Sequence, residues 1–197
     1  IVFDLGNVLI SFNPSEYLEK NNYPENLRKT ILADIFSSPE WLMLDNGEIN
    51  LEAAIDSIAK RSTLKRQEIA LFFDRRTDIM FPLDETVSIL PELNKQGFRL
   101  YYLSNFPIDI FPEVKKSYPF FKYFCGGIIS SEVHSSKPDV RIFRIFFEKY
   151  NLVPSECLYI DDIEKNVSVA ESLGMRGFST KGSGNIKKEL TNILNNE

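Results

Sequence analysis

The 197-residue sequence predicts an α/β fold: a doubly wound, Rossmann-like parallel sheet with an all-helical cap domain inserted after the first strand. Two observations predict this fold. Short apolar segments with no polar face alternate with amphipathic segments of helical period, as is typical of a parallel sheet covered on both faces. The first two apolar segments are separated by about 100 residues, whereas a βαβ unit takes on the order of 30. The surplus therefore indicates an inserted unit.

The apolar segments predict five strands, at residues 1–5, 98–103, 127–129, 157–160 and 177–179. The helices between them are predicted from apolar residues spaced i, i+3, i+4, i+7, and they cover residues 83–96, 139–150 and 166–173. In the first of these helices Asp84 is the expected N-cap and Gly97 the expected stop, and Pro91 predicts a kink or a restart.

Residues 12–80 carry helical patterns throughout and are predicted to form the cap, whereas residues 1–11 and 81–197 form the α/β core. Asn50 is the expected N-cap of one cap helix, and Ser62 or Thr63 that of the next. The cap aromatics are expected inside the cap rather than against a substrate, because most of the 16 Phe of the chain must be buried: Phe36, Trp41, Phe72 and Phe73.

Composition excludes several classes of protein. With 23 basic and 28 acidic residues the net charge is −5, which is not the basic surface of a nucleic-acid-binding protein. No apolar run reaches the length of about 18 residues that a membrane span needs, and the first residues do not resemble a signal peptide. Cys125 and Cys157 stand among apolar neighbours and are expected to be buried, reduced thiols. We expect a cytoplasmic protein, monomeric or homodimeric.

Polar residues collect where the predicted strands end. Ligands of parallel α/β sheets bind outside the carboxyl ends of the strands, so these side chains are expected to converge on one crevice. They are Asp4, Ser104, Asn105, Asp161, Asp162 and, one helical turn on, Asn166, together with Lys137 ahead of the helix at residues 139–150. A divalent cation relieves the repulsion between clustered carboxylates. This set of oxygen ligands fits Mg²⁺, whereas zinc favours His or Cys.

A carboxylate beside such a metal can attack phosphorus and form an aspartyl-phosphate, and Asp4 is the candidate nucleophile. Lys137, Ser104 and the amide of Asn105 are expected to stabilise the charge on the phosphoryl oxygens. These residues predict a Mg²⁺-dependent phosphatase acting on a small phosphorylated metabolite, with a sugar phosphate as one candidate.

Four segments of this chain resemble the motifs of the haloacid dehalogenase (HAD)-like hydrolase superfamily, in the family's order and spacing. They are Phe3–Val8, Leu103–Asn105, Ser136–Pro138, and Ile160–Asp162 with Asn166. The Asp-Leu-Gly-Asn-Val opening is similar to that of bacterial alpha-D-glucose-1-phosphate phosphatases and of the N-terminal phosphatase domain of soluble epoxide hydrolases. Trp41 and the stretch Asp45–Ile49 fit the same subgroup.

The resemblance implies a role for each site residue. Asp4 would be the nucleophile and a metal ligand, Gly6 would bind Mg²⁺ through its backbone carbonyl, and Asp162 would be the main ligand of the fourth motif. Asp161 or Asn166 would hold the metal's waters. The phosphate would be bound by Ser104, Asn105 and Lys137.

One departure from the family's first motif keeps two alternative functions open. Most phosphatases of this family carry a second Asp two residues after the nucleophile as general acid and base, and here that residue is Gly6. The first alternative is a 2-haloacid dehalogenase, which also lacks the second Asp but needs no metal and no acidic pair in the fourth motif. The second is a non-catalytic protein that binds phosphate or a partner.

The sequence does not decide the roles of two further residues, His134 and Glu48. His134, the only histidine, is expected to position backbone or contact solvent more readily than to contact a substrate. Glu48 either faces the crevice or pairs within the cap.

Overall fold

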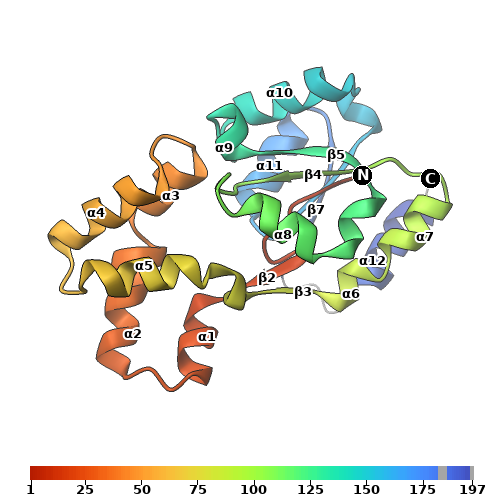
Figure 1. The fold of residues 1–197 in the computed structure, drawn as a ribbon. Coiled ribbons are helices and arrows are strands. Elements are labelled where there is room, and N and C mark those ends of the chain that lie inside the picture. Colours follow the sequence, from red (N-terminus) through yellow and green to blue (C-terminus); the bar gives the residue numbers. More distant parts are fainter. Residues whose placement is uncertain (182–185, 196–197) are drawn as a thin grey trace.

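The computed structural model describes residues 1–181 and 186–195, and its main feature is a parallel sheet of five strands in the order β5-β4-β1-β6-β7 (Figure 1). The strands are β1 (Val2–Phe3), β4 (Leu100–Ser104), β5 (Phe124–Ile129), β6 (Leu158–Asp161) and β7 (Arg176–Ser179). The predicted α/β class and all five predicted strands are confirmed. The first strand is shorter than predicted because the chain turns at Leu5, whose carbonyl accepts the amides of Leu9 and Ile10.

Helices cover both faces of the sheet, as a doubly wound fold requires. One face packs against α10 (Val140–Tyr150) and α11 (Glu164–Ser172) through an apolar cluster that includes Phe143 and Tyr159. The other face packs against four helices: α6 (Asp84–Val87), α7 (Leu90–Lys95), α8 (Phe111–Ser117) and α12 (Ile186–Asn195). The short helix α9 (Ser130–Val133) follows the carboxyl end of β5.

The predicted helix at residues 83–96 is interrupted, as expected from Pro91. Helix α6 ends at Val87 and α7 starts at Leu90, so that Pro91 occupies the first turn of α7, where a missing N–H costs nothing. The expected N-cap was wrong: Leu83 holds that position and Asp84 is the first helical residue. Gly97 has a φ of 92° and ends the segment, as predicted.

The region predicted as a cap consists of helices. They are α1 (Pro14–Lys20), α2 (Glu25–Ile31), a π-helical turn (Leu32–Phe36), α3 (Pro39–Asp45), α4 (Leu51–Arg61), α5 (Arg66–Asp74) and a 3-10 turn (Arg76–Ile79). These helices enclose an apolar cluster of their own, which includes Leu18, Ile35, Ile58 and Phe73. We use the word cap for residues 12–80, a division that stays a prediction.

The structure tests the N-cap residues expected for two helices of this region, α4 and α5. The Asn50 side chain accepts the amide of Ala53, which confirms it as an N-cap. The expected N-cap at Ser62 or Thr63 was wrong, because α5 begins at Arg66 and Lys65 holds the N-cap position. The Ser62 hydroxyl instead accepts the amide of Leu64 and donates to Asp34.

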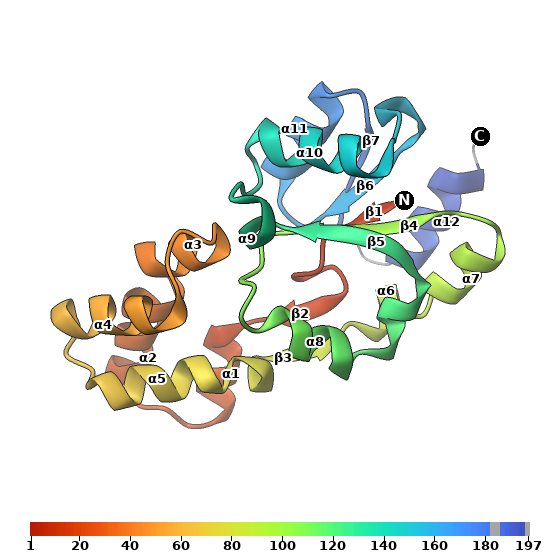
Figure 2. The ribbon, with the colours of Figure 1, turned by 45° about the horizontal axis from the view of Figure 1, so that its top comes forward.

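A short antiparallel pair that the sequence did not predict joins the cap to the sheet. Strand β2 (Ile10–Phe12) pairs with β3 (Met80–Pro82), with Ser11 opposite Phe81. Figure 2 shows the cap helices on the side toward which the carboxyl end of β5 points, with β2 and β3 forming the connection. In the sequence β2 precedes the cap helices and β3 follows them. Their pairing therefore brings the two ends of the cap together and holds the cap beside the ends of the sheet strands.

Three smaller expectations concern the remainder of the chain. Both cysteines are free, and Cys157 is buried as predicted, but Cys125 is exposed because it lies at the start of the edge strand β5. In the part of the chain that the structure describes, no helix combines the length and the apolar character needed to cross a membrane. The sequence also predicts a loop at Lys181–Gly184, and all of it except Lys181 lies outside the described residues.

Candidate active site

Three carboxylates meet at the carboxyl ends of the two central strands. Asp4 directly follows β1, Asp161 is the last residue of β6, and Asp162 comes next. The strands are adjacent, and the amide of Asp4 donates to the carbonyl of Ile160 at 2.8 Å. One carboxylate oxygen from each of the three Asp lies within 4.8 Å of the others. The convergence predicted from the sequence is therefore present.

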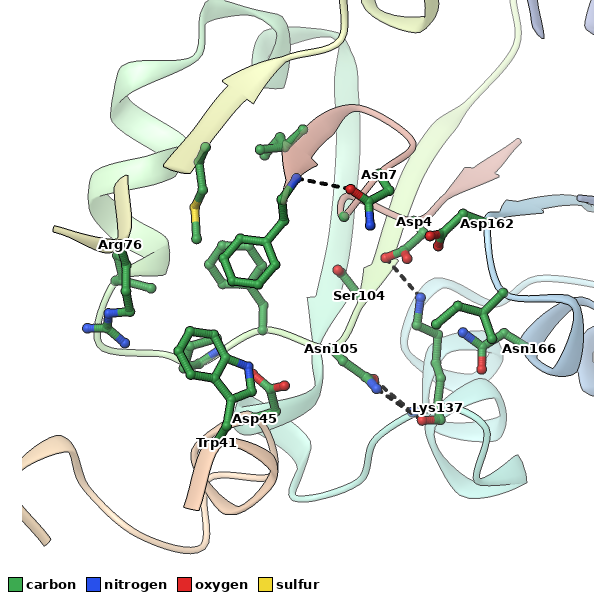
Figure 3. A pocket seen from close by; sticks show the side chains of 18 residues that line it. Asp4, Asn7, Trp41, Asp45, Arg76, Ser104, Asn105, Lys137, Asp162 and Asn166 are labelled. Carbon is green, nitrogen blue, oxygen red and sulfur yellow. Dashed lines mark hydrogen bonds and ion pairs between the residues drawn. The ribbon is translucent and has the colours of Figure 1, made fainter. Parts of the chain in front are cut away.

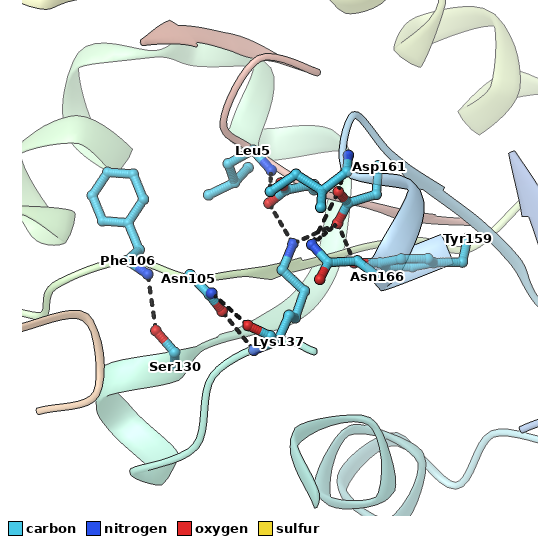
Figure 4. Close-up of polar contacts among 10 residues, drawn as sticks. Leu5, Asn105, Phe106, Ser130, Lys137, Tyr159, Asp161 and Asn166 are labelled. Carbon is cyan, nitrogen blue, oxygen red and sulfur yellow. Dashed lines mark hydrogen bonds and ion pairs between the residues drawn. The ribbon is translucent and has the colours of Figure 1, made fainter. Parts of the chain in front are cut away.

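Lys137 reaches the same point from the loop ahead of α10. Its Nζ lies 2.9 Å from Oδ1 of Asp4 and 2.8 Å from Oδ2 of Asp161, and its side chain is 1% exposed (Figure 4). Burial lowers the pKa of Lys137, but the charges of Asp4 and Asp161 outweigh burial and the net shift is upward. Lys137 is therefore a buried, charged ammonium beside the candidate nucleophile.

The Asn105 side chain holds the backbone of Lys137. Its Nδ2 donates to the Lys137 carbonyl at 3.0 Å, and its Oδ1 accepts the Lys137 amide at 2.8 Å. Both polar atoms of the side-chain amide are therefore occupied, and the role of the Asn105 backbone N–H toward phosphate stays a prediction. Ser104 ends β4 and is buried, and its hydroxyl is among the groups that lower the pKa of Asp4.

Asp161 is surrounded by donors. Besides Lys137, it accepts hydrogen bonds from the hydroxyl of Tyr159, the amide of Ile163 at 2.8 Å and the Nδ2 of Asn166 at 3.1 Å. The side chain of Asp161 is fully buried. Tyr159 is a residue that sequence reasoning missed, since a Tyr inside a buried strand carries no signal that its hydroxyl reaches a carboxylate two residues on.

Burial shifts the pKa of the other two carboxylates upward. Burial is the largest cause that raises the pKa of Asp4 to about 6; the Lys137 charge opposes the shift and the Asp161 charge adds to it. Burial and the charge of Asp161 also raise the pKa of Asp162, while a hydrogen bond from Asn7 opposes the shift. A nearby cation would stabilise both charged forms, so the chemistry of this donor set fits a divalent metal ion.

These residues line one end of a cavity of about 190 Å³ (Figure 3). Asp4, Asp162 and Lys137 lie on one side of it, Trp41 and Asp45 of the cap on the other, with Ser104 and Asn105 between them. The remaining lining is mostly apolar: Ile10, Phe12, Met80, Phe106, Pro107, Ile110 and Ile163, with Gly6, Asn7, Arg76 and Asn166. The cavity therefore has a charged end and an apolar end.

Trp41 belongs both to the apolar cluster of the cap and to the cavity lining. It packs on the cap core, with its ring stacked on Phe73 at 5.8 Å between centroids, and it also lines the cavity beside Phe12 at 5.6 Å. The expected packing in the cap core is confirmed, and Trp41 also reaches the cavity because α3 lies at the border between cap and core. Phe36, Phe72 and Phe73 are absent from the cavity lining, as expected.

His134 and Glu48 also lie outside that lining. The Nδ1 of His134 is 3.2 Å from the carbonyl of Asn46, so the histidine contacts cap backbone. Glu48 accepts a hydrogen bond from the Asn46 side chain at 2.9 Å, which confirms the interpretation that it pairs within the cap.

Comparison with known proteins agrees with this geometry. A family model of the haloacid dehalogenase-like hydrolases matches residues 1–174. The chain is 26% identical over 193 residues to a sesquiterpene phosphatase of Aspergillus oryzae, covering 98% of this chain and 95% of the relative. It is 24% identical over 208 residues to the D-ribitol-5-phosphate phosphatase of Bacteroides thetaiotaomicron, covering 99% and 98%.

A solved structure of a HAD family enzyme from Bacteroides thetaiotaomicron, in complex with magnesium and inorganic phosphate, has the same fold. The TM-score is 0.73 at 23% identity, over 95% of this chain and 96% of that one. The family model spans far more than half of the sequence and includes all four motif segments. The protein belongs to the haloacid dehalogenase-like hydrolases, and it is an enzyme of that class.

Proposed function

We propose that this protein is a Mg²⁺-dependent phosphatase that hydrolyses small phosphate monoesters through an aspartyl-phosphate on Asp4. The observation that carries the proposal is the position of Asp4 in the cavity, 2.9 Å from the buried ammonium of Lys137 and within reach of the Asp162 carboxylate. The names of the two phosphatase relatives, which match nearly the whole chain, support the same reaction.

Mg²⁺ would be held by Asp4, by Asp162 and by the backbone carbonyl of Gly6, all of which line the cavity. Such an ion neutralises charge on the phosphoryl oxygens and orients the substrate. The hydrogen bonds that Asp161 accepts from four donors favour a role for Asp161 in holding Lys137. Asn166, whose amide donates to Asp161, would act with it.

The proposed reaction has two steps. The Asp4 carboxylate attacks phosphorus and displaces the alcohol, while Lys137, the Ser104 hydroxyl and the backbone N–H of Asn105 stabilise the phosphoryl oxygens. Water next attacks the phosphorus of the aspartyl-phosphate, which frees Asp4 and releases phosphate.

The lining of the cavity supports an apolar alcohol rather than a sugar as the remainder of the substrate. Opposite Asp4 and Lys137 lie Trp41 and Asp45 of the cap, and the apolar part of the lining, which includes Phe12, Met80 and Ile110, offers no group that binds sugar hydroxyls. Arg76 also lines the cavity, but its guanidinium is paired with Asp109 at 2.5 Å. One relative acts on a sesquiterpene and the other on a sugar-alcohol phosphate, and the apolar wall favours the first kind of substrate.

The direct experiment is hydrolysis of p-nitrophenyl phosphate with Mg²⁺ by the wild type, by Asp4→Asn and by Asp74→Asn, an exposed carboxylate of the cap outside the cavity lining. We expect full activity in Asp74→Asn and none in Asp4→Asn. Turnover by Asp4→Asn would contradict the mechanism.

Two further measurements separate the alternatives. Halide release from 2-chloropropionate in the presence of EDTA would indicate a dehalogenase. Calorimetric binding of Mg²⁺ and a phosphate analogue, together with no turnover across a broad panel of phosphate esters, would indicate a binding protein.

The substrate class is tested by comparing alkyl phosphates of increasing chain length with glucose 1-phosphate and ribitol 5-phosphate. Each methylene buried in the apolar wall contributes about 0.8 kcal/mol, about fourfold in kcat/KM. We therefore expect kcat/KM to rise along the alkyl series and to exceed the values for both sugar phosphates. A flat alkyl series with rapid sugar phosphate hydrolysis would favour the sugar.

A further inference from the structure

Asp45 is a cap carboxylate that faces the catalytic end of the cavity. It is the last residue of α3, and it lines the same cavity as Asp4, Ser104 and Lys137 (Figure 3). The other two carboxylates of that lining, Asp4 and Asp162, come from the core. Asp45 therefore lies on the opposite side from the candidate nucleophile, where the alcohol part of a phosphate ester would leave.

Contacts with the core hold Asp45 in this position. Its backbone carbonyl accepts a hydrogen bond from the hydroxyl of Ser130, at the start of α9. The next residue, Asn46, accepts the Ser136 hydroxyl on its side chain and contacts the His134 ring through its carbonyl. The end of α3 is thus bound to the same segment of the core that carries Lys137.

The packing beside Asp45 is close. Gly47 has a φ of 67°, and a Cβ built on it would lie 2.6 Å from the carbonyl oxygen of Ser131. Only a residue without a side chain lets the two backbones approach this far. The geometry around Asp45 is therefore set by direct contact of cap backbone with core backbone.

The environment of the Asp45 carboxyl group favours its protonated form. Its Oδ1 is buried and has no hydrogen-bond partner among the residues that the structure describes. Burial is the largest cause that raises its pKa to about 7; the charge of Arg76 opposes the shift, and those of Asp109 and Asp4 add to it. The guanidinium of Arg76 is itself paired with Asp109, and its Nε donates to the carbonyl of Phe73.

The proposed reaction needs such a group. Displacement of an alkoxide requires a proton donor, and attack of water on the aspartyl-phosphate requires a proton acceptor. Gly6, two residues after Asp4, offers no side chain for either task. In the described part of the cavity lining, Asp45 is the carboxyl group that belongs neither to the nucleophile nor to the proposed metal ligands.

We propose that Asp45 is the general acid and general base of this enzyme, a catalytic residue supplied by the cap. This inference rests on the proposed phosphatase function. In the first step the Asp4–phosphorus bond forms, the phosphorus–oxygen bond to the alcohol breaks, and the Asp45 proton passes to the leaving oxygen. In the second step the Asp45 carboxylate takes a proton from the attacking water as the Asp4–phosphorus bond breaks, which restores both residues.

The experiment compares the wild type with Asp45→Asn on two substrates, an alkyl phosphate and p-nitrophenyl phosphate. The alkoxide needs a proton as it leaves, so we expect alkyl phosphate hydrolysis to fall by about 10²- to 10⁴-fold. The nitrophenolate leaves without one, so p-nitrophenol should still appear in a rapid burst equal to the enzyme concentration. A slow steady state should follow, because the second step has lost its base.

Two more variants complete the test. Glu48→Gln is the matched control, because this cap carboxylate lies three residues on but outside the cavity lining, and its activity should equal that of the wild type. A Cβ built on Gly6 meets no atom within 4 Å, so Gly6→Asp can start a side chain there, two residues after Asp4. Added to Asp45→Asn, it should restore at least part of the alkyl phosphate hydrolysis.

Each other outcome overturns the inference. Wild-type alkyl phosphate hydrolysis by Asp45→Asn would show that Asp45 transfers no proton. Equal losses in the burst and in alkyl phosphate hydrolysis, without rescue by Gly6→Asp, would show that Asp45 only positions the cap. Turnover by Asp4→Asn would instead contradict the proposed function itself, and the two failures are therefore distinguishable.

Discussion

The ammonium nitrogen of Lys137 lies 2.8 Å from Oδ2 of Asp161, and the two side chains are 1% and 0% exposed. A buried charge left without its partner is strongly destabilising, so each residue of this pair requires the other. Asp161 thereby places Lys137 beside Asp4, and the pair connects the fourth predicted motif to the proposed nucleophile.

The first prediction concerns this pair. We expect Lys137→Met and Asp161→Asn each to lower the free energy of unfolding by about 3 kcal/mol, and the double variant to lose less than the sum, because both charges are then removed together. Urea unfolding at pH 7 measures the three values. Strict additivity would show that the two residues do not interact energetically.

The second prediction separates the two adjacent aspartates. Asp162→Asn removes a proposed ligand charge, so we expect the Mg²⁺ dissociation constant to rise by at least about tenfold, whereas Asp161→Asn should change it less and chiefly lower kcat. Calorimetric titration of Mg²⁺ without substrate measures the first effect independently of activity. A larger loss of Mg²⁺ affinity in Asp161→Asn would reverse the assignment.

The third prediction tests the contact between cap and core. Gly47→Ala places a methyl group against the Ser131 carbonyl at a positive φ, which costs about 1 kcal/mol or more and moves the end of α3 away from the core. We expect kcat/KM to fall because Asp45 moves with it. Gly97→Ala is the matched control: it has a φ of 92° with no atom within 4 Å of the added Cβ, so it should lower the melting temperature and leave kcat/KM unchanged.

The fourth prediction is a pH dependence of stability. A hydrogen bond from Arg61 is the largest cause that lowers the pKa of Glu40 from 4.5 to about 2. Because the folded-state pKa lies below the unfolded one, the contribution of Glu40 is complete above about pH 5 and is lost as the pH falls toward 2. Glu40→Gln should therefore cost about 1–3 kcal/mol at pH 7 and little at pH 2.

Urea unfolding of Glu40→Gln and of the wild type at several pH values measures this difference. Glu52→Gln is the control, because Glu52 pairs with Arg66 on the surface, where an ion pair contributes about 0–1 kcal/mol. A cost of Glu40→Gln that does not change between pH 7 and pH 2 would contradict the assignment.

The fifth prediction tests the apolar end of the cavity. Trp41→Ala removes the largest apolar side chain of the wall, so we expect KM for a long alkyl phosphate to rise by about tenfold or more, with a smaller change for methyl phosphate. Phe72→Ala shortens another cap aromatic that is absent from the lining, and it should leave the ratio of the two KM values unchanged. Equal effects of Trp41→Ala on both substrates would place the alkyl chain elsewhere.

Much of the core could be predicted because its signals are local. A buried parallel strand needs an uninterrupted apolar run, and the residue that follows it lies at the carboxyl edge of the sheet. Asp4, Ser104 and Asp161 were therefore placed together from their positions in the sequence, and the structure brings them together. The β2–β3 pair escaped prediction because three residues are too few to show a strand period.

The sequence by itself determined the fold class, the order of the motifs and the convergence of the carboxylates with Lys137, because each depends on strands whose pattern is visible over a few residues. Only the tertiary structure decided which cap residues face the cavity. Trp41 and Asp45 lie on α3 of the cap, and their approach to Asp4 depends on contacts with Ser130 and Ser131, more than 80 residues away in the chain. Helical periodicity separates a buried face from an exposed one, but it does not say which neighbouring domain a face will meet.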